Sequence, residues 1–395
     1  MKILFYLPAV TPWWFEHVIE PLIRRVAGEA EVHVLAPVPW NNTGLGPSDL
    51  ARCADLPELH WAIVDDADHP SLRTVPKDRD GLIAYVRALA PDLVLCRSAD
   101  FETPQAFPGT VRYVMEAVTA PFGPVSPANT VHFTDAPFVN GAMPALAPDA
   151  VARIDALIAP FWTDMDAHWQ AAVYDRDSVF RHIGIPADRP AVLLPLEYEH
   201  AENFFLQHRP GALSNQALVA AIAAEAQTAG VTLVVTDHPL NKLHVERDTL
   251  LDFITDLDGT ILVDEPVFDV PPTMALARHV DGVVLGDSKS FAIAAAFGTP
   301  MHRRSRFASA PWLHAEPDLA AFLAAIRAGR AERPECAAVQ RWFGYHYANE
   351  AFYPTDPALT GAMVIDRAVR TLDSARWEAG VGRLRRFADP VREAA

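Results

Sequence analysis

The chain has 395 residues, of which 50% are apolar, and its formal net charge at neutral pH is −17. This length is sufficient to bury two hydrophobic cores, so we expect two domains. The acidic balance argues against nucleic acid as a partner, because proteins that bind phosphate backbones need clustered lysine and arginine side chains.

The sequence favours a cytoplasmic location. Three cysteines, Cys53, Cys96 and Cys336, are scattered without metal-ligand spacing, as is typical of a reducing compartment. The opening run MKILFYLPAV is interrupted by Pro8 and indicates a first buried strand rather than a signal peptide. No apolar run is long enough for a transmembrane helix. The arginines of the segment RLRRFADPVRE fit either a solvated helix face or a peripheral contact with inner-membrane headgroups.

Apolar strand-like runs alternate with helical stretches along most of the chain. In order, the predicted strands include KILFYLPAV, AEVHVLAPV, PDLVLCRS, AVLLPLEYE, VTLVVTD, TILVDEP and DGVVLGDS. Between them lie helical stretches such as SNQALVAAIAAEAQTAG, which we expect Ser214 to cap and Gly230 to end. Continuous apolar strands that alternate with helices are typical of parallel sheets covered on both faces. The predicted fold class is therefore α/β, with two doubly wound, Rossmann-like domains.

A polar, proline-containing stretch, FRHIGIPADRP, is the predicted domain boundary. It divides the chain into an N-terminal domain at residues 1–180 and a C-terminal domain at residues 181–335. Residues 336–395 are predicted to form a helical segment rich in aromatic side chains.

Polar residues follow the predicted strands of the second domain where a parallel sheet binds its ligands. Asp237, His238 and Pro239 end one strand, and the segment GDSKS ends another and opens a helix. Small residues at a helix start expose backbone N–H groups that suit a phosphate, although a simple N-cap explains the same residues. The GDSKS candidates are Gly286, Asp287, Ser288, Lys289 and Ser290.

The first domain offers two acids and an aromatic pair. Glu116 lies just past one predicted strand and Asp135 ends another, and each precedes a loop rich in proline and glycine. Carboxylates at such positions act as a general base or stabilise a cation in glycosyl transfer, and they also cap loops. Trp13 and Trp14 follow the first strand, where they fit either a sugar-stacking surface or the core.

Several other enzyme classes lack their motifs in this sequence. The chain has no G-x-G-x-x-G after a strand and no Walker lysine loop, which argues against dinucleotide oxidoreductases and P-loop enzymes. It also has no H-E-x-x-H and no G-x-S-x-G, which argues against zinc proteases and α/β-hydrolases.

The order of these features resembles the bacterial capsule polysaccharide biosynthesis family, which includes Kdo-type glycosyltransferases. The matching segments are LLPLEYEHAENF, VVTDHPLN and VLGDSKSFAIAAAFGTPM, together with VMEAVTAPFG and FTDAPFVNG in the first domain. They cover about residues 110–305. The chain departs from the family at Glu197, where the family has glutamine, and in the stretch HAEN. These departures leave UDP- and GDP-sugars open as donors.

The resemblance implies a GT-B arrangement, in which two Rossmann-like domains face each other across a cleft. It implies an acceptor domain first and a nucleotide-sugar domain second, with the C-terminal helical segment crossing back to the first domain. The implied donor is a CMP-activated ulosonic acid such as Kdo, and no metal and no cofactor are expected. The implied donor-binding residues are Glu197, Asp237, His238, Pro239, Gly286, Asp287, Ser288, Lys289 and Ser290.

The expected function is a metal-independent glycosyltransferase that builds a surface glycan such as capsule polysaccharide or lipopolysaccharide. His238, Glu116 and Asp135 are the expected catalytic residues, and Trp13 and Trp14 the expected acceptor contacts. Sequence does not separate inversion from retention, and the resemblance favours retention. Two alternatives stay open: a nucleotide-sugar epimerase or hydrolase of the same fold, and a non-catalytic protein that binds glycan or nucleotide. The expected partners are a nucleotide sugar and a glycan or glycolipid acceptor.

Overall fold

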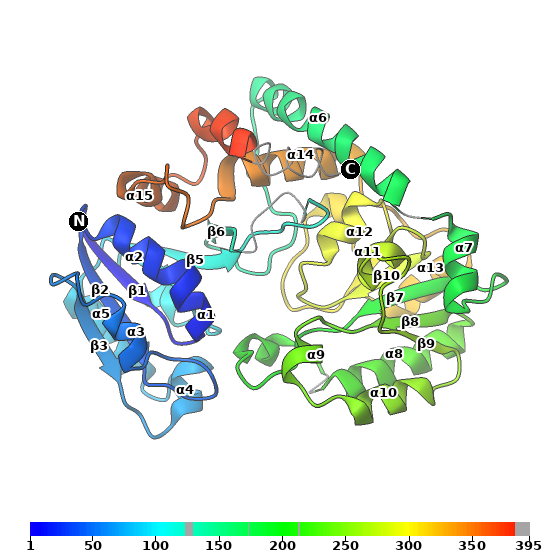
Figure 1. Ribbon diagram of the computed structural model, residues 1–395, viewed down its shortest axis with the longest axis horizontal. Helices are drawn as coiled ribbons and strands as arrows, with labels where there is room; N and C mark the ends of the chain where they lie inside the picture. Colours follow the sequence, from blue (N-terminus) through cyan, green and yellow to red (C-terminus); the bar gives the residue numbers. More distant parts are fainter. Residues whose placement is uncertain (123–128, 173, 212–213, 384–395) are drawn as a thin grey trace. The chain divides into compact units, whose positions relative to one another are not determined.

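The computed structural model describes residues 1–122, 129–172, 174–211 and 214–383. The chain forms two compact units (Figure 1). The first, here called the first domain, contains Met1–Thr119, Gly123–Pro137 and His346–Ala395. The second domain contains Ala120–Phe122 and Phe138–Tyr345. This division differs from the ranges expected from the sequence, because residues 138–180 group with the second domain and the chain after Tyr345 groups with the first.

The first domain is built on a six-stranded sheet with the order β3-β2-β1-β4-β5-β6. Neighbouring strands are parallel except β5 and β6, which are antiparallel. The strands are β1 (Lys2–Tyr6), β2 (Glu31–Pro37), β3 (His60–Val64), β4 (Leu93–Cys96), β5 (Thr110–Glu116) and β6 (Val131–Thr134). The helices are α1 (Pro12–Trp14), the π-helix η1 (Phe15–Ile19), α2 (Glu20–Val26), α3 (Pro47–Ala51), α4 (His69–Arg73), α5 (Arg79–Leu89), η2 (Pro104–Ala106), η6 (His346–Glu350), α15 (Gly361–Val369) and η7 (Ser374–Arg376).

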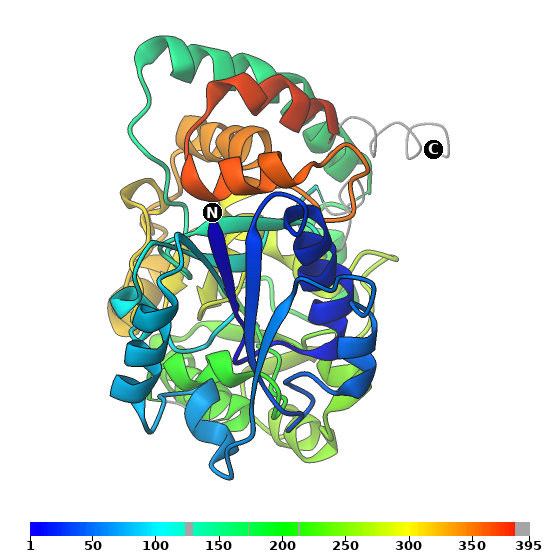
Figure 2. The ribbon, with the colours of Figure 1, turned by 90° about the vertical axis from the view of Figure 1, so that its left-hand side faces the viewer.

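This strand order makes the first domain doubly wound. The chain moves outward from β1 to β3 and then returns to the other side of β1 with β4. Because parallel crossovers are right-handed, the helices of the two directions cover opposite faces of the sheet. Figure 2 shows the blue strands of this sheet with dark-blue helices on one side and teal helices on the other. β1 is buried along nearly all its length, as expected for a central strand covered on both faces.

The chain after Tyr345 completes the first domain. Phe352 pairs with Val131 of β6 through two backbone hydrogen bonds of 2.8 and 2.9 Å. The fully buried Asn349 accepts hydrogen bonds from Trp377 and from the backbone of Asp373, and it donates to the carbonyl of Thr371. Buried polar groups need such partners to avoid a desolvation cost, so these bonds fix the path of the segment.

The second domain has a five-stranded, fully parallel sheet with the order β11-β10-β7-β8-β9. The strands are β7 (Ala191–Pro195), β8 (Thr232–Thr236), β9 (Thr260–Val263), β10 (Gly282–Leu285) and β11 (Met301–Arg303). The helices are α6 (Pro148–Ala172), α7 (Arg176–Ile183), η4 (Phe204–His208), α8 (Asn215–Ala229), α9 (Asn241–His244), α10 (Asp248–Thr255), α11 (Pro272–Ala277), α12 (Phe291–Ala296), η5 (Pro311–Leu313), α13 (Leu319–Arg327) and α14 (Cys336–Tyr345).

The predicted fold class is confirmed, since each domain is an α/β unit on a wholly or largely parallel sheet. The predicted limits of α8 are also confirmed. The Ser214 hydroxyl accepts a hydrogen bond from the backbone of Ala217, and Gly230 ends the helix with a φ of 69°. Across the described ranges, no helix combines the length and the apolar character that a bilayer span requires.

His302 gives the second domain a predicted dependence of stability on pH. It lies buried in β11, and its Nδ1 is 2.8 Å from the carbonyl oxygen of Glu316. Burial lowers the pKa of His302 below its ordinary value of 6.5. The unfolded chain therefore takes up a proton near that pH while the folded chain does not, so stability is lost as the pH falls through this region.

We expect His302→Asn to weaken this dependence, because the asparagine amide replaces Nδ1 as donor and does not titrate. The measurement is the thermal midpoint of unfolding between about pH 7.5 and about pH 5.5. His168→Asn, at an exposed position in α6, is the matched control. Equal pH profiles for wild type and His302→Asn would contradict the prediction.

Candidate functional site

The second domain has a topological switch point between β7 and β10. β8 and β9 lie on one side of β7, whereas β10 and β11 lie on the other. Parallel α/β sheets bind ligands beyond the carboxyl ends of the strands at such a point. Glu197 follows β7 and Asp287 follows β10, so the structure brings these two predicted donor-binding residues to the switch point.

A glycine allows the two strand ends to approach closely. The Glu197 Oε1 atom accepts a hydrogen bond of 2.9 Å from the backbone N–H of Asp287. A Cβ atom on Gly286 would lie 2.2 Å from the same oxygen, which no side chain could tolerate without displacing Glu197. The sequence-predicted residues Glu197, Gly286 and Asp287 therefore form one contact.

The carboxylate of Glu197 is neutralised within the protein. Its Oε2 atom lies 3.0 Å from Nε and 2.9 Å from Nη2 of Arg209, whose side chain is only 5% exposed. Arg209 also donates to the Oδ1 atom of Asn215. The backbone carbonyl of Glu197 accepts from the side-chain amides of Asn215 and Asn241. Glu197 therefore organises the loops around the switch point rather than presenting a charge that lacks a partner.

Asp287 is held by a second buried arginine. Its Oδ1 atom accepts hydrogen bonds from Arg303 at 2.8 Å and from the Ser305 hydroxyl at 2.5 Å. Burial raises the pKa of the Asp287 carboxyl, although Ser305 and Arg303 act in the opposite direction. Burial likewise lowers the pKa of Arg303 against the pull of Asp287. Desolvation is thus the largest cause of both pKa shifts, and each side chain depends on the other to stay charged.

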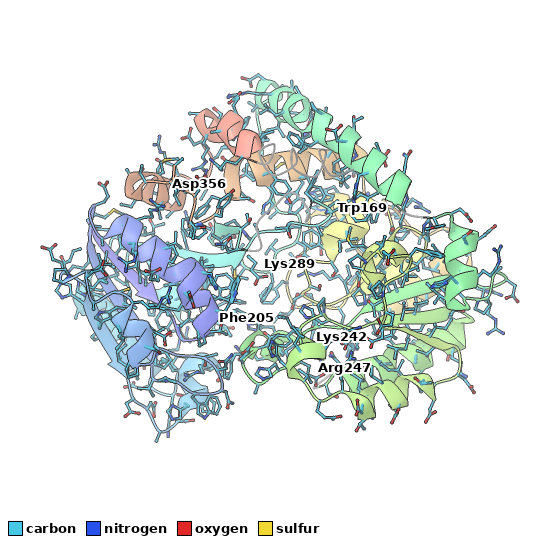
Figure 3. The ribbon with its side chains drawn as sticks, viewed as in Figure 1. Trp169, Phe205, Lys242, Arg247, Lys289 and Asp356 are labelled. Carbon is cyan, nitrogen blue, oxygen red and sulfur yellow. The ribbon has the colours of Figure 1, made fainter. Side chains whose placement is uncertain are left out.

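Asp237 is an anchor rather than an open ligand. Its side chain is 0% exposed, and its oxygens accept from Arg247 at 2.6 Å, from Asn241 at 2.8 Å and from the backbone of His238 at 2.8 Å. Arg247 also pairs with Asp264 through contacts of 3.1 and 3.0 Å, and Figure 3 labels this arginine beside α9 and α10.

His238 belongs to a group of stacked rings after β7 and β8. Its ring centroid lies 5.6 Å from that of Tyr198, and His200 stacks on the same tyrosine, also at 5.6 Å. The His238 Nδ1 atom accepts a hydrogen bond of 3.2 Å from the backbone of Leu240. This bond places the ring proton on Nε2, which is then a donor. Pro239, the next residue, is exposed.

The GDSKS segment forms a closed turn before a short helix. α12 begins at Phe291, later than the sequence suggested, and has six residues. The Ser288 hydroxyl lies 2.9 Å from the Ser290 hydroxyl and accepts from the backbone N–H of Ser290 at 3.1 Å. Lys289 is exposed on this turn and is labelled in Figure 3. The turn therefore places a lysine and two hydroxyls just after the switch point.

The first domain has its own switch point, between β1 and β4. The two predicted tryptophans differ in burial. Trp14 is 5% exposed and packs in the core, whereas Trp13 is 45% exposed and lies beside His17. The Arg97 guanidinium lies over the Trp14 ring, 3.7 Å from its centroid. Burial lowers the pKa of Arg97 to about 10, and Glu116 acts against that shift.

The two predicted acids of the first domain are not brought together. Glu116 ends β5, where it pairs in register with Val131. Because β6 runs antiparallel, Asp135 lies beside the earlier part of β5, with its Oδ2 atom 3.6 Å from Arg112 Nη1. The four residue-to-residue steps from Arg112 to Glu116 span about 13 Å of strand. Glu116 thus lies at the carboxyl edge of the parallel strands, and the exposed Asp135 lies away from it.

The three arginines of these contacts, Arg209, Arg247 and Arg303, were not predicted from the sequence. Arg209 and Arg247 lie in or beside loops, so no hydrophobic period marks them. Arg97 carried a usable signal, because it follows a strand of four buried residues directly.

A hollow of about 400 Å³ lies between α8 and α13, away from these residues. It is lined in part by Thr228, Leu323 and Arg327. Because α8 leads into the amino end of β8, the hollow is not at the carboxyl edge where the candidate donor residues lie.

No protein-family model matches this chain, and no curated protein matches it. Among solved structures it is similar to KpsC, a beta Kdo 2,4 transferase of Thermosulfurimonas dismutans, with 12% identity, a TM-score of 0.42 and coverage of 93% of this chain and 98% of that chain. It is also similar to the lipopolysaccharide outer core galactosyltransferase WaaB, with 11% identity, a TM-score of 0.36 and coverage of 94% and 99%. A third similar structure is E. coli ADP-heptose lps heptosyltransferase II, with 14% identity, a TM-score of 0.26 and coverage of 77% of this chain and 84% of that chain. TM-scores this low establish no shared fold, so the class of each domain rests on its own sheet.

Proposed function

We propose that this protein is a glycosyltransferase that binds a nucleotide sugar at the carboxyl edge of the second domain's sheet. The contact of Glu197 with Gly286 and Asp287 at the switch point carries the proposal, because parallel α/β sheets bind nucleotides there. The resemblance of the surrounding segments to capsule polysaccharide enzymes supports the same function. The acceptor in this proposal is a growing surface glycan or glycolipid.

The proposed donor is a CMP-linked ulosonic acid, and its leaving phosphate is assigned to two groups. His238 supplies an Nε2 proton, and the turn from Ser288 to Ser290 supplies hydroxyls together with the Lys289 ammonium. Donors fixed in place before the reaction stabilise the charge that grows on a leaving phosphate. The Lys289 ammonium supplies the positive charge of this set, and the proposed mechanism uses no divalent metal.

The proposed catalytic carboxylate is Glu116. It shares the carboxyl edge of the first domain's sheet with Arg97, where its charge opposes the lowering of the Arg97 pKa by burial. Asp135 is the weaker candidate, because it lies along β5 beside Arg112. In this proposal the Glu116 carboxylate either takes the proton of the acceptor hydroxyl or stabilises the glycosyl cation. The family resemblance favours the second course, with retention of configuration.

Calorimetric titration with CMP, UDP, GDP and CDP, with and without magnesium, tests the donor site. We expect CMP to bind best and without magnesium. We expect His238→Ala to weaken CMP binding by about 10- to 100-fold, the cost of one hydrogen bond to a charged group. His244→Ala is the matched control, because His244 is an exposed member of the same ring group.

Other outcomes change specific parts of the proposal. Tight binding of UDP or GDP would change the donor class and leave the site in place. An unchanged affinity in His238→Ala would remove His238 from the site. Failure of every nucleotide to bind would overturn the assignment of the donor edge. Release of free sugar from the donor without acceptor would favour an epimerase or hydrolase.

A further inference from the structure

Three side chains with metal-binding atoms converge at the start of β2 and β3 in the first domain. Glu31 and His33 are two residues apart on β2, so they project from the same face of the sheet. His60, the first residue of β3, pairs in register with His33. The two imidazole rings stack with centroids 4.5 Å apart and an angle of 19° between their planes.

From this geometry we infer that Glu31, His33 and His60 form a binding site for a divalent transition metal ion. One ligand atom of each side chain lies within 4.8 Å of the other two. His33 Nε2 is already 2.7 Å from Glu31 Oε1. Two ligands on one ion, each at about 2.1 Å, lie up to about 4 Å apart, so small side-chain rotations complete the site.

The ligand set selects the class of metal. Two imidazoles and one carboxylate suit Zn²⁺, Cu²⁺ or Ni²⁺, whereas Mg²⁺ and Ca²⁺ prefer oxygen ligands throughout. Among the residues that the structure describes, no other three histidine, cysteine or carboxylate side chains converge to this degree.

One neighbouring charge opposes the metal. The Lys2 Nζ atom lies 3.6 Å from Glu31 Oε1 and also donates to the carbonyl of Leu89. A bound cation must share Glu31 with this ammonium or displace it, which lowers the affinity. We therefore expect the Lys2→Met variant to bind the metal more tightly than wild type, so this variant tests the site by an increase in affinity.

The site lies at the opposite edge of the sheet from the proposed chemistry. Glu31, His33 and His60 lie at or near the amino ends of their strands, whereas Arg97 and Glu116 lie at the carboxyl ends of β4 and β5. A metal here would join the edge strand β3 to β2 and stabilise the fold by mass action. It would take no part in sugar transfer, so the inference stands apart from the proposed function.

The experiment titrates Cu²⁺ into the untagged full-length protein and follows binding by calorimetry and electron paramagnetic resonance. Every protein in this experiment also carries Cys336→Ser, because an exposed thiol can itself bind the metal. We expect one equivalent to bind with nitrogen hyperfine structure from two imidazoles, and we expect Mg²⁺ not to compete. His60→Ala should retain one nitrogen and weaken binding at least tenfold, about what loss of a partner around a metal site costs.

Two further variants separate this site from others. His168→Ala, at an exposed position in α6, should bind as wild type does. Glu31→Gln, which removes a ligand charge without shortening the side chain, should weaken binding even if His60→Ala fails to fold. The inference is wrong if His60→Ala and Glu31→Gln both bind as wild type. It is also wrong if the signal is lost in His200→Ala instead, because the ion would then lie beside Tyr198.

Discussion

Replacing Arg303 by methionine is expected to destabilise the second domain by about 3–5 kcal/mol. The guanidinium is only 3% exposed and donates to Asp287, to the Ser309 hydroxyl and to the carbonyls of Phe138 and Ala308. Methionine fills a similar volume but donates to none of them. The substitution leaves the Asp287 carboxylate buried without its charge partner, and this accounts for most of the loss.

The measurement is urea-induced unfolding followed by tryptophan fluorescence, with the thermal midpoint as a second readout. Arg303→Lys should recover only part of the loss, because an ammonium cannot reproduce the planar fork that serves several acceptors. Arg306→Lys is the matched control, since Arg306 is exposed and lies over Phe307. A loss of unfolding free energy below about 1 kcal/mol in Arg303→Met would contradict the prediction, because Arg303 would then contribute no more than an ordinary surface ion pair.

Replacing Glu116 by glutamine is expected to lower the rate of sugar transfer by about 10²- to 10⁴-fold. The amide keeps the size of the side chain but neither accepts a proton nor stabilises a cation. Nucleotide binding should stay unchanged, because the proposed donor residues belong to the second domain. The measurement is turnover of the donor identified by calorimetry, with nucleotide affinity determined on the same variant.

Asp135→Asn is the matched control for that substitution. Asp135 is exposed and makes a 3.6 Å ion pair with Arg112, so its loss should change the rate by less than about fivefold. The opposite result, a severe defect in Asp135→Asn with a mild one in Glu116→Gln, would assign the catalytic role to Asp135 instead. Similar mild effects in both variants would remove both residues from the reaction.

The periodic part of the fold could be predicted from the sequence because its causes are local. Continuous apolar runs indicated the buried parallel strands, and Ser214 and Gly230 indicated the limits of α8. The convergence of the segments after β7 and β10 followed from strand ends, since the carboxyl ends of parallel strands meet at one edge of a sheet. Glu197 itself was named through the family resemblance, and it contacts Asp287.

The remainder depended on contacts between residues distant in sequence. Arg209 and Arg303 reach their carboxylates from a loop and from the end of a strand, and nothing in the surrounding pattern marks their partners. The antiparallel direction of β6 moved Asp135 away from Glu116, and a short apolar run does not reveal strand direction. The domain limits were equally non-local, because Val131 pairs with Phe352.

The division of the chain has a consequence for biosynthesis. The first domain's core includes Phe352, Leu359, Val364 and Ala368, which the ribosome adds after the whole of the second domain. Apart from Ala120–Phe122, the second domain is one continuous segment, Phe138–Tyr345. The domain that is translated first is therefore completed last, and a nascent chain that has emerged from the ribosome as far as Tyr345 contains the whole second domain and a first domain whose core is still open.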